Sequence, residues 1–165
     1  EEIIVCTVEN VTYTSVGDGF PWMQLDVCVD TVYKGKFQQG DQISVYVSGG
    51  YIPMQVHIDD SHLGPFFSDV SEEEAANTIM EFKYDFKEFP KAGDTYLLAV
   101  KEPLHFPSIP EGAYIMWAET AGTMFVPQED GSFLCDVNGL HFTEAELTNA
   151  IATVPEVTQG AYLEE

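Results

Sequence analysis

The sequence predicts a mainly β fold: a small closed Greek-key barrel of five strands, with a helix-containing insertion after strand three and a C-terminal helix. Three observations carry this prediction. Short apolar segments recur along the chain, glycine-containing turns separate them, and one long connection follows the third segment. With 165 residues, of which 45% are hydrophobic, the chain can bury a sizeable core, and we expect a single domain over residues 1–165.

Three strands are predicted in the first third of the chain. Residues 3–14 are rich in β-branched side chains, and their apolar alternation slips between Val8 and Val11, which predicts a bulge. Residues 22–33 and 42–48 alternate between apolar and polar side chains. This period of two is typical of strands that bury one face.

Two strands open with the same pair of residues. Gly40-Asp41 precedes the strand at 42–48, and Gly93-Asp94 precedes a further alternating run at 95–101. Glycine and aspartate are turn residues for different physical reasons, glycine by its backbone freedom and aspartate by its side-chain acceptor. We interpret the two pairs as one type of turn used twice.

The insertion covers residues 49–92. Ser71 and Glu74 have the spacing of a capping box, which predicts a helix that runs to about Met80. The alternation of aromatic and charged residues at 82–86 predicts a short strand after this helix.

The last third of the chain contains a proline-rich loop followed by three more predicted strands. These strands are expected at 113–120, 123–127 and 132–136, with glycine-containing turns between and after them.

A second capping box predicts the C-terminal helix. Thr143 and Glu146 are spaced as its two partners, and the helix is expected to end near Ala152. The residues expected to face the sheet are Leu147, Ala150 and Ile151.

The charge balance excludes several classes of partner. The chain has 28 acidic residues against six lysines and no arginine, which gives a net charge of −22. Binding to nucleic acid requires cations that displace counterions from phosphate, so we expect none. A solubilising acidic surface explains this charge, and divalent cations, a basic partner or a salt-rich habitat are the alternatives. No apolar run is long enough for a transmembrane segment.

Three cysteines are present, and none has the paired spacing of a zinc or redox motif. Alternation places Cys6 on the inner face of its strand and Cys28 on the polar face of the next. Because they face opposite ways, we expect no disulfide between them, and we interpret Cys135 as a free thiol as well.

Short segments of the first 126 residues carry a resemblance to a known family. They are Ile3-Ile4-Val5 with Val8, Tyr33-Lys34-Gly35, Gly40-Asp41 with Ile43 and Val45, Gly49-Gly50-Tyr51-Ile52-Pro53, and the run from Pro90 to Leu98. In these the chain resembles the netrin-like or tissue-inhibitor-of-metalloproteinase-like OB-fold domains of uncharacterised secreted proteins and lipoproteins of Gram-positive bacteria. The matching positions are turns and strand starts, so they bear on fold rather than on chemistry.

The resemblance implies an extracellular or cell-surface domain whose leader has been removed, with a binding role and no enzymatic activity. The true inhibitors meet the metal of their target through an N-terminal cysteine, whereas here residue 1 is Glu1 and the first cysteine is Cys6. Metalloproteinase inhibition is therefore not carried over. A metal-dependent hydrolase and a structural spacer module are the alternatives to a binding domain that interacts with a protein or surface ligand.

The densest group of potential metal ligands lies in the insertion, at His57, Asp59, Asp60 and His62. Imidazole and carboxylate groups suit zinc and similar divalent cations. No single regular conformation gathers all four, because an extended segment separates them into two pairs and a helical turn joins only His57 and Asp60. A divalent cation is the one cofactor that the sequence leaves open, and a solvated loop is the alternative. His105 and His141 flank loops and are interpreted as structural.

Aromatic residues of the insertion are the candidate binding residues: Tyr51, Phe66 and Phe67. A long ordered loop on a rigid scaffold often carries binding. The alternative is that these rings fasten the insertion onto the barrel as a plug. The two hypotheses differ in burial, because a plug hides Phe66 and Phe67 completely and a binding surface leaves at least one ring edge exposed beside a groove.

Overall fold

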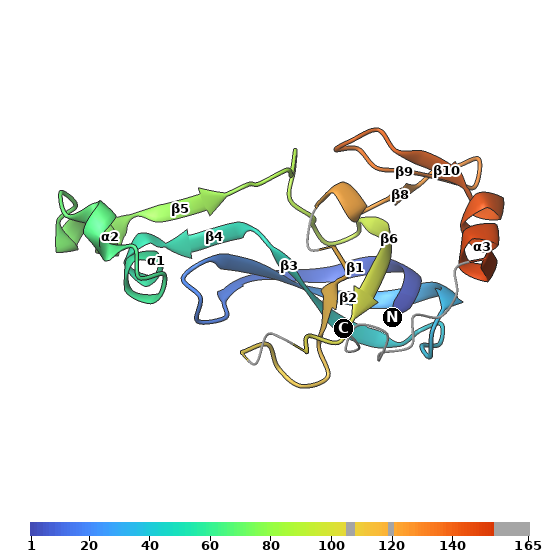
Figure 1. The fold of residues 1–165 in the computed structure, drawn as a ribbon, viewed down its shortest axis with the longest axis horizontal. Helices are drawn as coiled ribbons and strands as arrows, with labels where there is room; N and C mark the ends of the chain where they lie inside the picture. Colours follow the sequence, from blue (N-terminus) through green and yellow to red (C-terminus); the bar gives the residue numbers. More distant parts are fainter. Residues whose placement is uncertain (105–107, 119–120, 154–165) are drawn as a thin grey trace, which may run out of the picture.

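The computed structural model describes residues 1–104, 108–118 and 121–153. Its centre is a closed barrel of β1 (Glu2–Ser15), β2 (Pro21–Lys34), β3 (Gln42–Ser48), β7 (Tyr114–Met116) and β6 (Thr95–Lys101), paired in that order around the ring (Figure 1). β3 and β7 run parallel, and the other pairs are antiparallel. The predicted fold class, a mainly β chain with a five-stranded barrel, is confirmed.

The barrel interior is filled by one face of each long strand. On β2 the predicted inward face is buried from Met23 to Val29, and on β1 Ile4, Cys6 and Val8 fill the same core. The expected slip in β1 is present, since its register against β2 shifts between Val8 and Asn10. The bulge lets one strand present its apolar residues to the core on both sides of the irregularity.

The two turns that open β3 and β6 have the same construction. In each, the aspartate carboxylate accepts a hydrogen bond from the backbone N–H three residues earlier, Gln38 to Asp41 at 2.8 Å and Lys91 to Asp94 at 3.0 Å. The glycine of each pair has a positive φ, +90° and +93°. The interpretation as one turn used twice is therefore confirmed.

A second sheet lies beside the barrel and consists of three short strands. They are β8 (Val126–Pro127), β9 (Ser132–Leu134) and β10 (His141–Thr143). β8 and β9 are shorter than the strands expected at 123–127 and 132–136, and β10 was not predicted. A 3₁₀ turn, η2 (Ala121–Thr123), occupies the start of the segment expected as strand 123–127. β7 is likewise shorter than the expected 113–120, of which residues 119–120 lie outside the described residues.

The C-terminal helix α3 (Glu144–Thr153) begins at the predicted capping box. Glu146 N–H donates to Thr143 Oγ1 at 3.2 Å, and Thr143 N–H donates to Glu146 Oε2 at 2.8 Å. Of the three residues expected to face the sheet, Leu147 and Ile151 are half-buried, whereas Ala150 is exposed. The helix therefore touches the sheet by a narrower stripe than its apolar pattern predicts.

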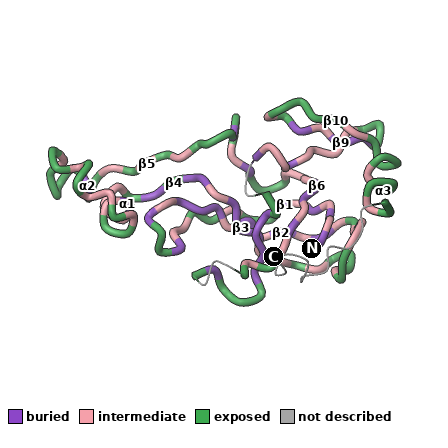
Figure 2. The backbone as a smooth tube through the Cα atoms, in the orientation of Figure 1, coloured by how far each residue is buried: buried purple, intermediate pink, exposed green. Residues whose placement is uncertain are grey.

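The insertion forms an arm that projects from the barrel (Figure 1). A two-stranded ribbon of β4 (Gly50–Pro53) and β5 (Ile79–Phe82) leads outward and back, and α1 (Met54–Asp60), η1 (Gly64–Phe67) and α2 (Glu72–Asn77) form its end. Buried residues follow β3 into β4, while α2 at the tip is mostly exposed (Figure 2). We call residues 49–82 the arm.

Two boundaries predicted for the arm are wrong. α2 starts as expected, with Ser71 Oγ accepting from Glu74 N–H at 3.1 Å, but it ends at Asn77 instead of near residue 80. Thr78 is extended, and Ile79 pairs with Pro53, so the pairing of β5 with β4 overrides the helical tendency. The short strand is therefore Ile79–Phe82 and not 82–86.

We predict that the barrel core dominates stability. Leu98 of β6 is fully buried, so Leu98→Ala should lower the free energy of unfolding by about 3 kcal/mol, through lost burial and a residual cavity. Urea denaturation followed by fluorescence of the buried Trp22 measures this change. Leu140→Ala is the matched control, because that leucine is 57% exposed and its loss should change stability by less than about 0.5 kcal/mol. Equal urea midpoints for the two variants would contradict this assignment of the core.

Candidate functional site

The arm is held against the barrel at one buried contact. His57 of α1 is only 3% exposed, and its Nδ1–H donates to the carbonyl oxygen of Gly19 at 2.6 Å. The carbonyl can only accept, which assigns the proton to Nδ1. The imidazole ring is surrounded by the rings of Phe20, Phe67 and Phe82, with centroids 5.2 to 5.6 Å away. We call these five residues the joint, because they connect the tip of the β1–β2 hairpin to the arm.

The predicted metal ligands are not gathered at one point. His57 is engaged in the joint, Asp59 is exposed and accepts from Gln55 Nε2 at 2.9 Å, and Asp60 is exposed at the end of α1. His62 lies beyond the helix with a left-handed backbone, φ 59°. Within the described ranges, no group of three or more His, Cys, Asp or Glu residues is placed to hold a metal ion. The cation hypothesis therefore rests on the sequence alone and stays a prediction.

The two remaining histidines lie elsewhere. His141 of β10 is within hydrogen-bond distance of the buried Ser132, with 2.8 Å between Nε2 and Oγ, which fits its structural interpretation. His105 lies outside the described residues.

The three predicted contact aromatics have different surroundings. Phe66 of η1 is 83% exposed, Phe67 is half-buried in the joint, and Tyr51 of β4 is 39% exposed. A plug required complete burial of both phenylalanines, so that expectation fails at Phe66. The neighbouring Phe67 packs against His57 in the joint, so the two adjacent rings differ in burial. Phe66 lines neither of the two hollows described below, and the groove expected beside it stays a prediction.

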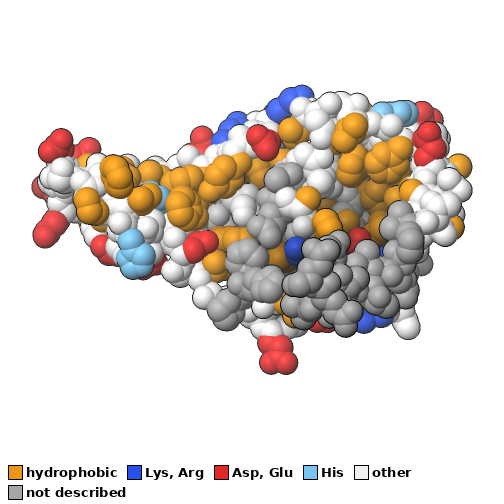
Figure 3. Space-filling model, viewed as in Figure 1, with side chains coloured by type: hydrophobic (Ala, Val, Ile, Leu, Met, Phe, Trp, Pro, Cys, Tyr) orange, Lys and Arg blue, Asp and Glu red, His pale blue; other side chains and the backbone are white. Residues whose placement is uncertain are grey.

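The ribbon presents one face to solvent. Register places Tyr51 opposite Glu81 and Pro53 opposite Ile79, and all four residues are exposed. Ile79 is 62% exposed, which is high for an isoleucine in a strand. We call Tyr51, Pro53, Ile79 and Glu81 the exposed arm face. Figure 3 shows hydrophobic side chains along the arm on the side that faces the viewer.

Tyr51 is fixed in place rather than mobile in solvent. Its ring packs edge-on against Tyr13 at 4.9 Å and Phe89 at 5.4 Å between centroids. Its hydroxyl donates to Glu81 Oε1 at 3.0 Å, and this hydrogen bond raises the pKa of the tyrosine, which therefore stays protonated at neutral pH. A pre-positioned aromatic side chain loses little conformational entropy when a partner covers it.

Sequence reasoning missed Ile79, Tyr13 and Tyr84 as surface residues. Tyr13 is 39% exposed and Tyr84 is 57% exposed. Ile79 was assigned to a helix, and Tyr13 to a strand without a stated role. No local signal identifies Ile79, because Ile79 and Met80 are both apolar and break the period of two that is typical of a strand with one buried face.

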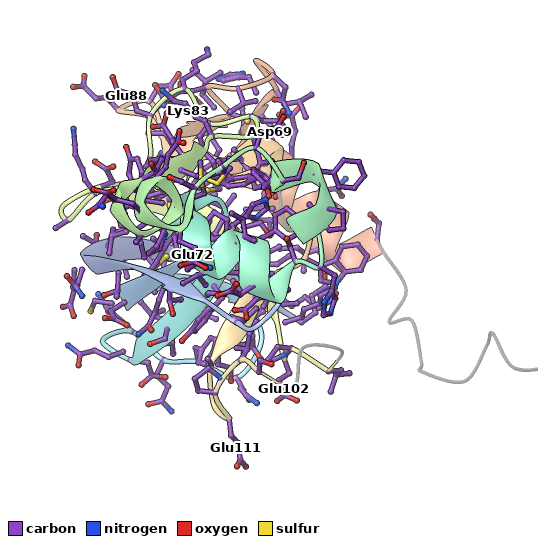
Figure 4. All side chains as sticks on the ribbon, turned by 90° about the vertical axis from the view of Figure 1, so that its left-hand side faces the viewer. Asp69, Glu72, Lys83, Glu88, Glu102 and Glu111 are labelled. Carbon is purple, nitrogen blue, oxygen red and sulfur yellow. The ribbon has the colours of Figure 1, made fainter. Side chains whose placement is uncertain are left out.

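The arm is also acidic and has no cation of its own. Residues 49–82 contain no lysine, and the first lysine after β3 is Lys83. Asp69 and Glu72 belong to the tip that faces the viewer in Figure 4. The acidic residues of the arm are Asp59, Asp60, Asp69, Glu72, Glu73, Glu74 and Glu81.

A polar groove of about 640 Å³ lies over β2 and β3. At its centre Asp26 Oδ1 accepts from Gln24 Nε2 at 2.9 Å and from Ser44 Oγ at 2.7 Å, and Oδ2 accepts from Asn10 Nδ2 at 3.3 Å. Partial burial pushes the pKa of Asp26 upward, but the hydrogen bonds from these three donors outweigh it and hold the pKa below its usual value. Both oxygens of the carboxylate are thus hydrogen-bonded by neighbouring side chains, and we interpret the groove as structural.

A second hollow, of about 460 Å³, lies between the 86–91 segment and β6. Burial, with Asp94 beside it, raises the pKa of Tyr96, whose hydroxyl donates to Asp94 Oδ2 at 3.2 Å. Lys87 Nζ donates to the backbone oxygen of Asp136 across the opening. The polar groups of this hollow are therefore largely paired with one another.

The three cysteines are free thiols, as predicted. Cys6 and Cys135 are completely buried, and Cys28 is half-exposed on the outer face of β2. Burial, together with the nearby Asp30 and Cys28, raises the pKa of Cys6 to about 12. Because the thiolate is the nucleophile, Cys6 is unsuited to nucleophilic chemistry at neutral pH.

Comparison with known proteins gives no relative: no family model, curated protein or solved structure matches the chain. Among the described helices, none has both the length and the apolar character needed to cross a bilayer. The arm therefore stands as the candidate site on its geometry alone.

We predict that the close approach of Gly19 to α1 holds the joint together. A Cβ on Gly19 would lie 2.3 Å from the backbone nitrogen of Ser61, so Gly19→Ala should force α1 away and speed amide hydrogen exchange in α1, while barrel amides keep their protection. Gly40→Ala is the control, because Gly40 has a similar positive φ but nothing within 4 Å of its added Cβ. Gly19→Ala should lower stability by about 1–3 kcal/mol more than the control. Equal losses of stability in the two variants would show that backbone strain at a positive-φ glycine, and not the clash with α1, decides the outcome.

We also predict an order of thiol reactivity. In folded protein at pH 8, iodoacetamide should label the half-exposed Cys28 first and Cys6 at least about a hundredfold more slowly than in denaturant, because Cys6 is buried and its pKa is about 12. Raising the pH towards that value should speed the labelling of Cys6, since more of it becomes thiolate. Mass spectrometry of peptides from timed samples gives each rate, and rapid labelling of Cys6 at pH 8 would contradict its position in the core.

Proposed function

We propose that this chain is a non-enzymatic interaction domain of a secreted or surface-anchored protein, and that it binds a partner protein through the arm. The observation that carries the proposal is the exposed arm face together with Phe66 at the tip. The ring of Phe66 is 83% exposed and Ile79 is 62% exposed. Apolar side chains of this size on a projecting element are typical of partner-binding surfaces.

The energetics of the arm support binding rather than folding as the role of these side chains. Covering an exposed aromatic or aliphatic side chain with a partner gains about 25 cal/mol per Å² of apolar area. Leaving such side chains in water gives no stabilisation to the folded chain. The barrel and the joint hold the ribbon in place, so the partner meets a prepared surface, which keeps the entropy cost of association low.

The location outside the cell is proposed from the resemblance to netrin-like domains. The five-stranded barrel is the fold that this resemblance implies. The excess of acidic residues, 28 against six lysines, fits a solvent-facing domain and argues against nucleic acid as the partner.

We predict that two substitutions on the arm abolish partner binding without unfolding the chain. Phe66→Ala with Ile79→Ala removes two exposed side chains, and the loss of central interface residues typically costs about 2 kcal/mol or more, roughly thirtyfold in affinity. Capture from cell-envelope and extracellular extracts by immobilised wild-type protein should return a partner that the double variant does not retain. Circular dichroism should show the same fold for both.

Leu140→Ala is the matched control, since Leu140 is similarly exposed but belongs to the turn before β10 and not to the arm. It should retain the partner as the wild type does. A partner retained equally by the double variant would place the interface elsewhere, and turnover in a broad hydrolase screen would favour an enzyme.

A further inference from the structure

β5 is an edge strand. It pairs with β4 on one side, and it runs along the outer margin of the arm (Figure 1). A strand at such an edge presents backbone N–H and C=O groups that can pair with another chain. The question is which backbone groups of β5 point outward.

The alternation of an antiparallel pair answers this question. Met54 N–H donates to Thr78 C=O at 2.9 Å, so residues 54 and 78 form a hydrogen-bonded pair. The next pair along, Pro53 with Ile79, is then non-hydrogen-bonded, and so is Tyr51 with Glu81. Proline has no N–H to donate, which fits this position. The backbone groups of Ile79 and Glu81 therefore point away from β4.

These outward groups are available. Among the residues that the structure describes, no backbone hydrogen bond outside the strand pairing uses the N–H or C=O of Ile79 or Glu81. Their side chains are exposed on the exposed arm face. Ile79 and Glu81 thus combine outward-pointing backbone groups with exposed side chains.

We propose that β5 accepts an extended, basic segment of a partner protein as an added strand. This inference rests on the proposed function and specifies the partner. The backbone of the segment pairs with Ile79 and Glu81, as in other cases of strand addition. Ile79 and Glu81 share one face, so two residues of the segment that are two positions apart lie beside them: an apolar residue beside Ile79 and a lysine or arginine beside the Glu81 carboxylate.

The charge of the arm selects a basic occupant. All seven charged side chains of residues 49–82, histidines aside, are acidic, and Glu72 to Glu74 stand at the start of α2, just before β5. A second copy of the chain would instead bring Glu81 towards its own equivalent and join two molecules of charge −22. Lys83 follows the strand directly, so the basic stretch of the partner ends before that point.

The test uses full-length protein and a fluorescein-labelled decapeptide with threonine at every second position and valine and arginine in turn at the positions between, so that valine and arginine share one face. Fluorescence anisotropy at 150 mM salt should show saturable binding, weakened at least tenfold when alternate residues of the peptide are N-methylated, because the charge is kept but backbone donors are lost. Hydrogen exchange should slow at least tenfold at the amides of Ile79 and Glu81 when the peptide binds. The amides of Met80 and Phe82, which already point to β4, should change little.

Variants separate the backbone from the charge. Glu81→Gln should weaken binding several-fold and keep the slowed exchange, whereas Glu81→Pro removes an outward N–H and should abolish binding. Leu140→Ala should bind as the wild type does. Should the proline variant misfold, the exchange measurement on wild-type protein still decides.

Equal binding of the plain and N-methylated peptides, or unchanged exchange at Ile79 and Glu81, would overturn strand addition. That result leaves the proposed function intact as long as Phe66→Ala with Ile79→Ala still loses its captured partner. If every arm variant still bound both the captured partner and the peptide, strand addition and the proposed function would both be overturned.

Discussion

The projecting arm depends on the hydrogen bond between the buried imidazole of His57 and the carbonyl of Gly19. A ribbon of two four-residue strands is not stable alone in water and needs packing against another element. The joint provides that packing through Phe20, Phe67 and Phe82, and the hydrogen bond satisfies the polar groups that the packing buries. The position of the exposed arm face follows from this contact together with the packing of Tyr51 against Tyr13 and Phe89.

The same contact explains why the cluster of potential ligands in the sequence is not gathered around His57 in the structure. His57 belongs to the densest cluster of potential ligands in the sequence, yet its ring is enclosed by aromatic side chains and its Nδ1 is committed to a backbone carbonyl. Phe66 and Phe67 look equivalent in sequence, but one is in solvent and the other in the joint. The burial of these side chains depends on elements far away in the chain, so no local sequence pattern predicts it.

Local patterns nevertheless predicted most of the architecture. The barrel strands follow from the period of two, and the turns before β3 and β6 follow from the chemistry of the Gly-Asp pairs. The helix starts at Ser71 and Thr143 follow from side-chain caps that act within three residues. The end of α2 could not be predicted in this way, because the pairing of Ile79 with Pro53 across the arm ends it. Ile79 was missed as a surface residue for the same reason.

An open edge strand beside apolar side chains is a hazard for self-association, and the charge of the chain limits that hazard. β5 contains Glu81 and follows the acidic start of α2, and the arm has no lysine, so two copies that approach edge to edge meet like charges. Charge repulsion between exposed groups extends about 8 Å at physiological salt, which is greater than the spacing of about 4.8 Å between neighbouring strands. A basic strand is attracted by the same acidic residues over the same distance. The acidity that keeps copies apart therefore also favours a partner of opposite charge at the same edge.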